Sequence, residues 1–390
     1  MDRNFVDIMN RLHLQSFGPI KSADVHFGDL TILIGQQASG KSVFLQLLKL
    51  LIDKRNIRAV LEQYGYIWRQ PADSILDLYF GEGMSPIWTK QTAVQFDNAS
   101  YSKDFILPAK GKQSDSTEER LFYIPAQRIL SLADGRPKNF MEFDSSTPYI
   151  LRHFSETLRL LFQNGLRAKE SMFPVRDRLK EPIRKSLNES IFHDGKVFVD
   201  DSSGLKKLRM KIDDMNVPFM TWSAGQKEFM PLLMGFYWLC PPSAKARKGA
   251  CKYVVIEEPE MGLHPQAIMS VLVQILDLLA RGYKVIVSTH SPILLEFAWA
   301  FQWLKLANKP GALYTMFGMP QTPATANIFT NILEKTIKTF YFAREGTNVV
   351  SKDISDLDAA SEDIAIAEWG GLSAFASRVS SIVAEYAADE

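Results

Sequence analysis

The chain has 390 residues, of which 46% are hydrophobic, which is enough for two or three domains or one elaborated α/β domain. Its 45 basic and 44 acidic residues leave a formal charge of +1, so no global basic surface indicates nucleic acid, although a local patch is not excluded. The two cysteines, Cys240 and Cys251, lack metal-ligand spacing and suit a reducing compartment, and we interpret both as core residues. The longest apolar stretch, residues 229–242, is too short to cross a bilayer, so we expect a cytoplasmic protein without membrane contact.

Hydrophobic periodicity predicts alternating strands and helices along much of the chain. Two short alternating strands are joined across a Gly-Pro turn, and the later buried strands follow helices in the rhythm of a parallel sheet. The predicted strands are 12–17, 23–27, 30–34, 121–125, 196–199, 253–256, 284–288 and 339–342. The predicted helices are 41–53, a segment within 148–193 interrupted by two prolines, 227–239, 265–279 and 372–387.

The segment 35–42 fits the spacing G-x-x-x-x-G-K-[ST] between a predicted buried strand and a predicted helix. Backbone N–H groups of such a loop face a phosphate chain, and the helix N-terminus adds a favourable dipole. Lys41 supplies a charge to the β- and γ-phosphates, and the Ser42 hydroxyl is a ligand for Mg²⁺. We therefore predict an ATP site formed by Gly35, Gln36, Gln37, Ala38, Ser39, Gly40, Lys41 and Ser42.

Two acids follow the predicted strand 253–256, and a histidine follows the predicted strand 284–288. Hydrolysis of ATP requires a carboxylate that helps to hold Mg²⁺ and a second group that orients the attacking water. We assign Glu257 to the metal and Glu258 to the water, against the alternative of an acidic loop with no catalytic role. A neutral His290 is placed to donate to the γ-phosphate and to sense its loss.

The segment 223–226 opens an apolar helix with a hydroxyl and small residues, which is another anion site. One chain does not need two such sites for one triphosphate, whereas two copies arranged head to tail complete each other's site. We therefore predict that Ser223, Gly225 and Gln226 contact ATP bound by a second copy in a homo-oligomer. The alternative is an ordinary serine N-cap with a glycine for close packing.

Together these motifs resemble the ABC-type ATPase superfamily: residues 35–42 match Walker A, 223–226 the signature, Glu257 and Glu258 Walker B, and His290 the H-loop. The segments 32–42, 257–265 and 288–292 resemble the RecF/OLD-like branch, often labelled AAA ATPases. The resemblance implies an α/β P-loop NTPase of ABC/RecF-like type, with a mixed sheet, flanking helices and a helical subdomain. It also implies an Mg²⁺-dependent ATPase.

Four positions depart from the family pattern. Alanine replaces glycine at Ala38 and Ala224, glutamine replaces asparagine at Gln37, and glutamate replaces aspartate at Glu257. The resemblance also implies a Q-loop, for which Gln127 is our candidate. The adjacent Arg128 is interpreted as a ligand of phosphate or of a partner carboxylate.

We divide the chain into four regions. Residues 1–145 are the N-terminal half of the ATPase core, 146–220 a mostly helical insertion, 221–310 the C-terminal half, and 311–390 an α/β tail that is a candidate contact region for partners or other copies. The aromatic cluster Tyr64, Tyr66 and Trp68 is interpreted as core packing, with stacking on a base as the alternative.

OLD-family proteins usually carry a C-terminal Toprim nuclease, but residues 295–390 offer no Asp-x-Asp pair on a strand. Any nuclease-like effector is therefore expected on a separate chain. Stand-alone ATPases of this type resemble the ATPase components of bacterial anti-phage systems such as PARIS and Septu, which implies a switch subunit in antiviral defence. The alternative is a RecF-like repair ATPase that binds DNA, which the near-neutral charge does not favour.

Overall fold

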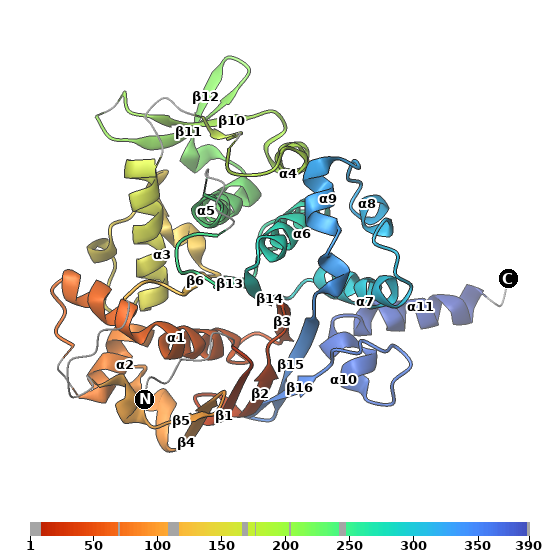
Figure 1. Ribbon diagram of the computed structural model, residues 1–390, viewed down its shortest axis with the longest axis horizontal. Coiled ribbons are helices and arrows are strands. Elements are labelled where there is room, and N and C mark those ends of the chain that lie inside the picture. The colour runs from red at the N-terminus through yellow and green to blue at the C-terminus, as the bar shows by residue number, and fades with distance from the viewer. Residues whose placement is uncertain are drawn as a thin grey trace.

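The computed structural model describes residues 9–68, 71–107, 117–165, 171–175, 177–202, 204–241 and 247–387. Within them, helices lie on both faces of one large sheet (Figure 1). Its strands are β1 Arg11–Phe17, β2 Ile20–His26, β3 Leu30–Gly35, β4 Trp88–Phe96, β5 Ala99–Tyr101, β6 Leu121–Ile124, β13 Tyr253–Glu257, β14 Lys284–Ser288, β15 Ile337–Glu345 and β16 Asn348–Asp353. The helices are α1 Lys41–Gln63, α2 Ala72–Phe80, α3 Tyr149–Leu160, α4 Glu181–Leu187, α5 Ala224–Leu239, α6 Pro265–Ala280, α7 Pro292–Leu306, α8 Ala312–Met316, α9 Pro323–Phe329, α10 Ile364–Ala367 and α11 Ala374–Ala387.

The large sheet has the strand order β5-β4-β1-β2-β16-β15-β3-β14-β13-β6. The strands from β15 to β6 run parallel to one another, whereas β1 pairs antiparallel with β2 and β4, and β4 pairs antiparallel with β5. This arrangement confirms the α/β P-loop fold with a mixed sheet and flanking helices. Because parallel strands share one carboxyl edge, the loops after β3, β14, β13 and β6 are neighbours.

Hydrophobic cores lie on both faces of the parallel strands. Alternate residues of β13 point to opposite faces: Val254 and Ile256 pack with α5 and α6, and Tyr253 and Val255 pack with α1 and α2. All five residues of β13 are buried, which is why this strand reads as a continuous apolar run. Figure 1 shows α1 and α2 on one side of the sheet and α5 and α6 on the other.

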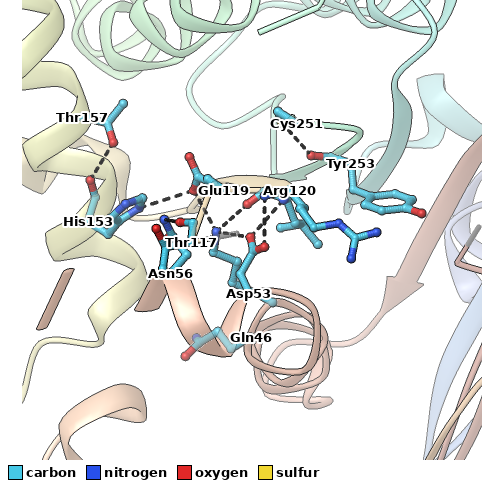
Figure 2. A network of polar contacts seen from close by, with 12 residues as sticks. Gln46, Asp53, Asn56, Thr117, Glu119, Arg120, His153, Thr157, Cys251 and Tyr253 are labelled. Atoms are coloured by element: carbon cyan, nitrogen blue, oxygen red, sulfur yellow. Dashed lines mark hydrogen bonds and ion pairs between the residues drawn. The ribbon is translucent and has the colours of Figure 1, made fainter. Parts of the chain in front are cut away.

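Helix α1 runs ten residues beyond the predicted end at residue 53, through a kink at Asp53. The kink coincides with a buried ion network (Figure 2). Lys49 Nζ lies 2.7 Å from Asp53 Oδ2, 2.7 Å from Glu119 Oε1 and 2.5 Å from the carbonyl oxygen of Leu121. Asp53 also accepts the backbone N–H groups of Arg120 and Leu121, at 3.0 and 2.9 Å. The network joins α1 to the start of β6.

The region predicted as a mostly helical insertion also contains a sheet. Four strands pair antiparallel in the order β12-β11-β10-β9. In the chain, β9 lies between helices α3 and α4, and the other three strands follow α4. These strands are β9 Ser171–Phe173, β10 Lys196–Asp200, β11 Lys207–Ile212 and β12 Met215–Pro218. The sequence indicated only β10, so the strands that pair with it were missed.

The C-terminal region is divided between the core and the surface. Strand β15 pairs with β3, and β16 pairs with β2, so both strands lie in the middle of the large sheet. Helix α11, in contrast, projects away from the rest of the chain (Figure 1).

Two further sequence-based interpretations concern buried residues. Cys240 and Cys251 are buried free thiols, as predicted, and burial raises the pKa of both. Trp68 is buried, and Tyr64 stacks on Phe140, so the packing interpretation of the aromatic cluster is confirmed for these two residues. Among the described residues, no helix combines the length and apolar character required to cross a membrane.

Candidate nucleotide site

The loop between β3 and α1 has the backbone shape of a phosphate cradle. Gly35 and Gly40 have φ angles of 154° and 80°. A Cβ atom on Gly35 would lie 2.7 Å from the carbonyl oxygen of Phe342 on β15, so only glycine fits there. Ala38 has a φ of 56°, which costs an alanine about 1 kcal/mol. Arg344 Nη2 donates to the Ala38 carbonyl over 2.8 Å, and this hydrogen bond stabilises the strained conformation of Ala38.

The side chain of Lys41 folds back over this loop. Its Nζ donates to the carbonyl oxygens of Gly35 and Gln36, over 2.8 and 3.1 Å, and to Ser39 Oγ over 3.2 Å. Burial lowers the pKa of Lys41 to about 8, against the opposing effect of the nearby Glu258, Glu257 and Glu260 carboxylates. The three acceptors of this buried ammonium group are all uncharged. The group is therefore suited to exchange these hydrogen bonds for stronger ones to charged phosphate oxygens.

Glu257, the last residue of β13, meets the loop at Ser42. Burial raises the pKa of its carboxyl group, and the Ser42 hydroxyl and the Ala126 N–H oppose that rise. Oε2 accepts the Ala126 N–H over 3.3 Å, whereas the buried Oε1 has no well-formed hydrogen bond. Mg²⁺ is usually held by one or two protein oxygens together with substrate phosphates and water. The Ser42 hydroxyl and the unsatisfied Glu257 Oε1 fit that ion. Among the described residues, no cluster of three or more His, Cys, Asp or Glu side chains could bind a metal without the nucleotide.

Glu258 and His290 face each other beside Lys41. Glu258 has a φ of 44°, and its N–H donates to the carbonyl of Ser288 on β14 over 2.8 Å. This unusual conformation turns its side chain toward His290, whose Nε2 lies 3.7 Å from Glu258 Oε1. Burial and the charge of Lys41 lower the pKa of His290, so the imidazole is neutral near pH 7. A neutral imidazole retains one N–H donor and one acceptor.

Glu260 is a site residue to which the sequence analysis gave no role. Its Oε1 accepts the His290 N–H over 2.6 Å and the Thr289 hydroxyl over 2.8 Å. The carboxylate thus ties the loop after β13 to the loop after β14. Its position two residues beyond the paired acids was the available signal, but only the fold shows what it contacts.

Arg128 is a structural residue in this chain, and the interpretation as a ligand of phosphate or of a partner carboxylate is wrong. Its fully buried guanidinium donates to the main-chain carbonyls of Glu228, Glu257 and Glu258, over 3.2, 3.0 and 3.1 Å. It thereby joins helix α5 to the end of β13. The adjacent Gln127, the candidate Q-loop residue, is exposed at the end of β6, on the same edge of the sheet as the P-loop.

The signature-like segment lies at the N-terminus of α5. Ser223 Oγ accepts the Gln226 N–H, and Gln226 Oε1 accepts the Ser223 N–H, each over 3.2 Å, which is a capping box. A Cβ atom on Gly225 would lie 2.7 Å from the Gly262 carbonyl oxygen. The capping and close packing of the alternative interpretation are therefore both present. No hydrogen bond or ion pair joins 223–226 to 35–42 within the described chain, and Ser223 is exposed.

Residues 131–296 match the profile of a family described as "AAA domain, putative AbiEii toxin, Type IV TA system". The matched segment is similar to AAA-type ATPase domains. It includes the signature-like segment, both acids after β13 and His290, and the P-loop precedes it. No match was found among curated proteins.

Solved structures similar to this chain include SMC heads and a bacterial ABC transporter cassette. An SMC head bound to the C-terminal winged-helix domain of ScpA is 11% identical over 88% of this chain and 97% of its own, with a TM-score of 0.40. The SMC head domain from Thermotoga maritima is 11% identical over 88% and 98%, with a TM-score of 0.34. The dimeric bacterial ABC transporter cassette MJ0796 is 13% identical over 72% and 88%, with a TM-score of 0.32. At such identities the likeness concerns the fold alone.

Proposed function

We propose that this chain is an ATP-binding and ATP-hydrolysing switch subunit that pairs around ATP and controls a separate effector in bacterial antiviral defence. One observation carries the ATPase part of this proposal. The adjacent parallel strands β3, β14 and β13 deliver the P-loop, His290 and Glu258 to one edge of the sheet. Such an edge is where open α/β sheets bind their ligands.

Each side chain at this edge has a role in that reaction. Lys41 exchanges its loop carbonyls for phosphate oxygens, and the loop N–H groups bind the remaining phosphate charge. Ser42 and Glu257 are the residues that would hold Mg²⁺, which when bound neutralises charge between the β- and γ-phosphates. Glu258 accepts a proton from the attacking water, and the neutral His290 donates to the γ-phosphate.

The pairing of two copies is supported by the separation of Ser223 from the P-loop within a single chain. Ser223 is exposed at the start of the sixteen-residue helix α5 and makes no bond to the P-loop of its own chain. A helix N-terminus attracts phosphate, and in a head-to-tail pair this one faces the γ-phosphate held by the other copy. ATP bound between both copies stabilises the pair, and hydrolysis releases it.

Dimerisation with trapped ATP tests this proposal. In Glu258→Gln, ATP and Mg²⁺ are expected to produce a stable dimer by light scattering at low micromolar protein, because the nucleotide is bound but not cleaved. Adding Ser223→Arg to the same chain should retain ATP binding by equilibrium dialysis and abolish the dimer. A monomeric Glu258→Gln chain with ATP bound, or a double variant that dimerises equally well, would contradict pairing through ATP.

The defence role is supported by the family description, which names a putative toxin and a Type IV TA system. Cells that express the chain with its genomic neighbours are expected to survive phage infection, and Lys41→Ala should remove that protection. If Lys41→Ala instead leaves phage survival unchanged and makes cells sensitive to DNA damage, the repair alternative replaces the defence role.

A further inference from the structure

Helix α11 is exposed on all sides. Every side chain from Phe375 to Tyr386 is exposed, and the helix projects from the body of the chain (Figure 1). An isolated helix of its 14 residues is marginally stable in water, because most helical stability in proteins comes from packing of one face. The helix therefore lacks the contacts that stabilise the other long helices of this fold.

The large apolar side chains of α11 form one continuous stripe. Phe375, Val379, Ile382 and Tyr386 are separated by four, three and four residues, which is the a/d spacing of a coiled-coil seam. Their exposed fractions are 73%, 42%, 56% and 68%, and Val383 beside them is 59% exposed. The rest of the helix between these residues is alanine or serine, apart from Arg378 and Glu385. No part of the chain that the structure describes covers this stripe.

The spacing of this stripe is the same when it is read from either end. In an antiparallel pair of α11 helices, Phe375 of one copy therefore lies opposite Tyr386 of the other, and Val379 lies opposite Ile382. Every layer of the seam is one of these two apolar pairs. With Val379 and Tyr386 at a positions, Arg378 and Glu385 both occupy g positions, which flank the seam. In an antiparallel pair the g residues of the two helices face each other, so Arg378 of each copy meets Glu385 of the other.

A parallel pair does not match these charges. In that orientation a g residue faces an e residue, so Arg378 would lie opposite the apolar Val383 of the second copy. The charged pairs thus favour one occupant and one orientation for the stripe, namely a second copy of this chain running antiparallel.

We propose that α11 pairs with α11 of a second copy through this antiparallel seam, without any need for nucleotide. The interface adds to the ATP-dependent one and does not depend on it. A helix of this length is about 21 Å long, so the seam is smaller than a standard protein interface and the association is weak by itself. Its effect is to raise the local concentration of a second ATPase core, so that ATP closes a pair that is already tethered.

Sedimentation equilibrium of the full chain without nucleotide and with EDTA tests the seam. At protein concentrations on the order of 100 μM, the wild-type chain is expected to populate a dimer. Val379→Glu should raise the dissociation constant at least about tenfold, because it places a charge in the seam. Ser377→Glu is the matched control, since it adds the same charge on the opposite face of the same exposed helix, and it should dimerise as the wild type does. A monomeric wild-type chain, or equal association of both variants, would overturn the proposal.

Charge exchange tests the orientation. Arg378→Glu leaves two acids per helix, and Glu385→Arg leaves two bases, so each variant alone should associate more weakly than the wild type. An equimolar mixture of the two variants should associate more tightly than either alone, because every antiparallel g pair is then complementary. A mixture no tighter than the separate variants would overturn the antiparallel register. Because nucleotide is absent, neither result depends on the ATP-driven dimer of Glu258→Gln.

Discussion

The backbone N–H of His290 donates to Oε1 of Glu260 over 2.6 Å, and the Thr289 hydroxyl donates to the same oxygen. This contact fixes the loop that carries the histidine relative to the loop that carries Glu258. Because Glu260 acts through the position of His290, we expect Glu260→Ala to lower kcat by about 10- to 100-fold with little change in ATP affinity. Glu260→Gln retains an acceptor and should lose much less. Steady-state kinetics combined with ATP binding separates these effects, and a variant with impaired affinity and normal kcat would refute the positioning role.

Lys41 makes nucleotide affinity depend on pH. Its pKa is lowered to about 8 by burial, and bound phosphate favours the charged form. The cation is present below that pKa and is lost above it, so ATP affinity should fall by up to about tenfold per pH unit between pH 8 and 9.5. The γ-phosphate is already ionised in this range. Calorimetric titrations at several pH values measure the slope, and an affinity that stays constant up to pH 9.5 would contradict the lowered pKa.

The Arg128 guanidinium is expected to contribute to stability and not to ATP binding directly. Arg128→Met removes the guanidinium hydrogen bonds to the carbonyls of Glu228, Glu257 and Glu258, of which Glu258 keeps the Met261 N–H as a donor; a hydrogen bond to a charged group contributes roughly 1.5–3 kcal/mol. We therefore expect the free energy of unfolding to fall by about 3 kcal/mol or more. Denaturant unfolding measures this change, and Gln127→Ala, the exposed neighbour, serves as the control. Equal stability of both variants would show that the guanidinium is dispensable.

The Lys49 network should be far more sensitive than a surface ion pair. Asp53→Asn removes one of the two carboxylates that neutralise a fully buried ammonium group, which we expect to cost about 3 kcal/mol of unfolding free energy. Glu189→Gln breaks the exposed pair with Lys185 at the same i,i+4 spacing and should cost less than about 0.5 kcal/mol. Chemical denaturation of both variants provides the comparison; similar losses would mean that the buried network is not coupled to folding.

Sequence alone predicted the parts of the fold that depend on local pattern. The P-loop, the buried strands β3, β13 and β14, and the helices α1 and α6 that follow β3 and β13 are encoded in contiguous apolar runs with turn residues at their ends, whereas α7, which follows β14, was not predicted. The extension of α1 was missed because its continuation beyond Asp53 depends on Glu119 and Leu121, which are distant in the sequence.

Long-range pairing explains the other differences. Strand β15 joins β3 although some 300 residues separate them, and nothing in the local pattern of either strand specifies that neighbour. The same limit applies to Arg128 and Glu260. Their residue types indicated charge at the site, but their acceptors and donors are main-chain groups that only the folded chain brings close.

Complementation between two inactive variants tests the sandwich of two copies around ATP most directly. Lys41→Ala disables the P-loop of its own chain, and Ser223→Arg disables the site that the chain completes in its partner. In a mixed dimer, one of the two ATP sites combines the intact P-loop of one copy with the intact Ser223 of the other. Each variant alone should be inactive. An equimolar mixture should recover about a quarter of wild-type ATPase activity if the copies pair at random, and about a half if only mixed dimers close around ATP, since each mixed dimer has one intact site of two. A mixture as inactive as its components, or a Ser223→Arg chain that hydrolyses ATP by itself at the wild-type rate, would contradict the account.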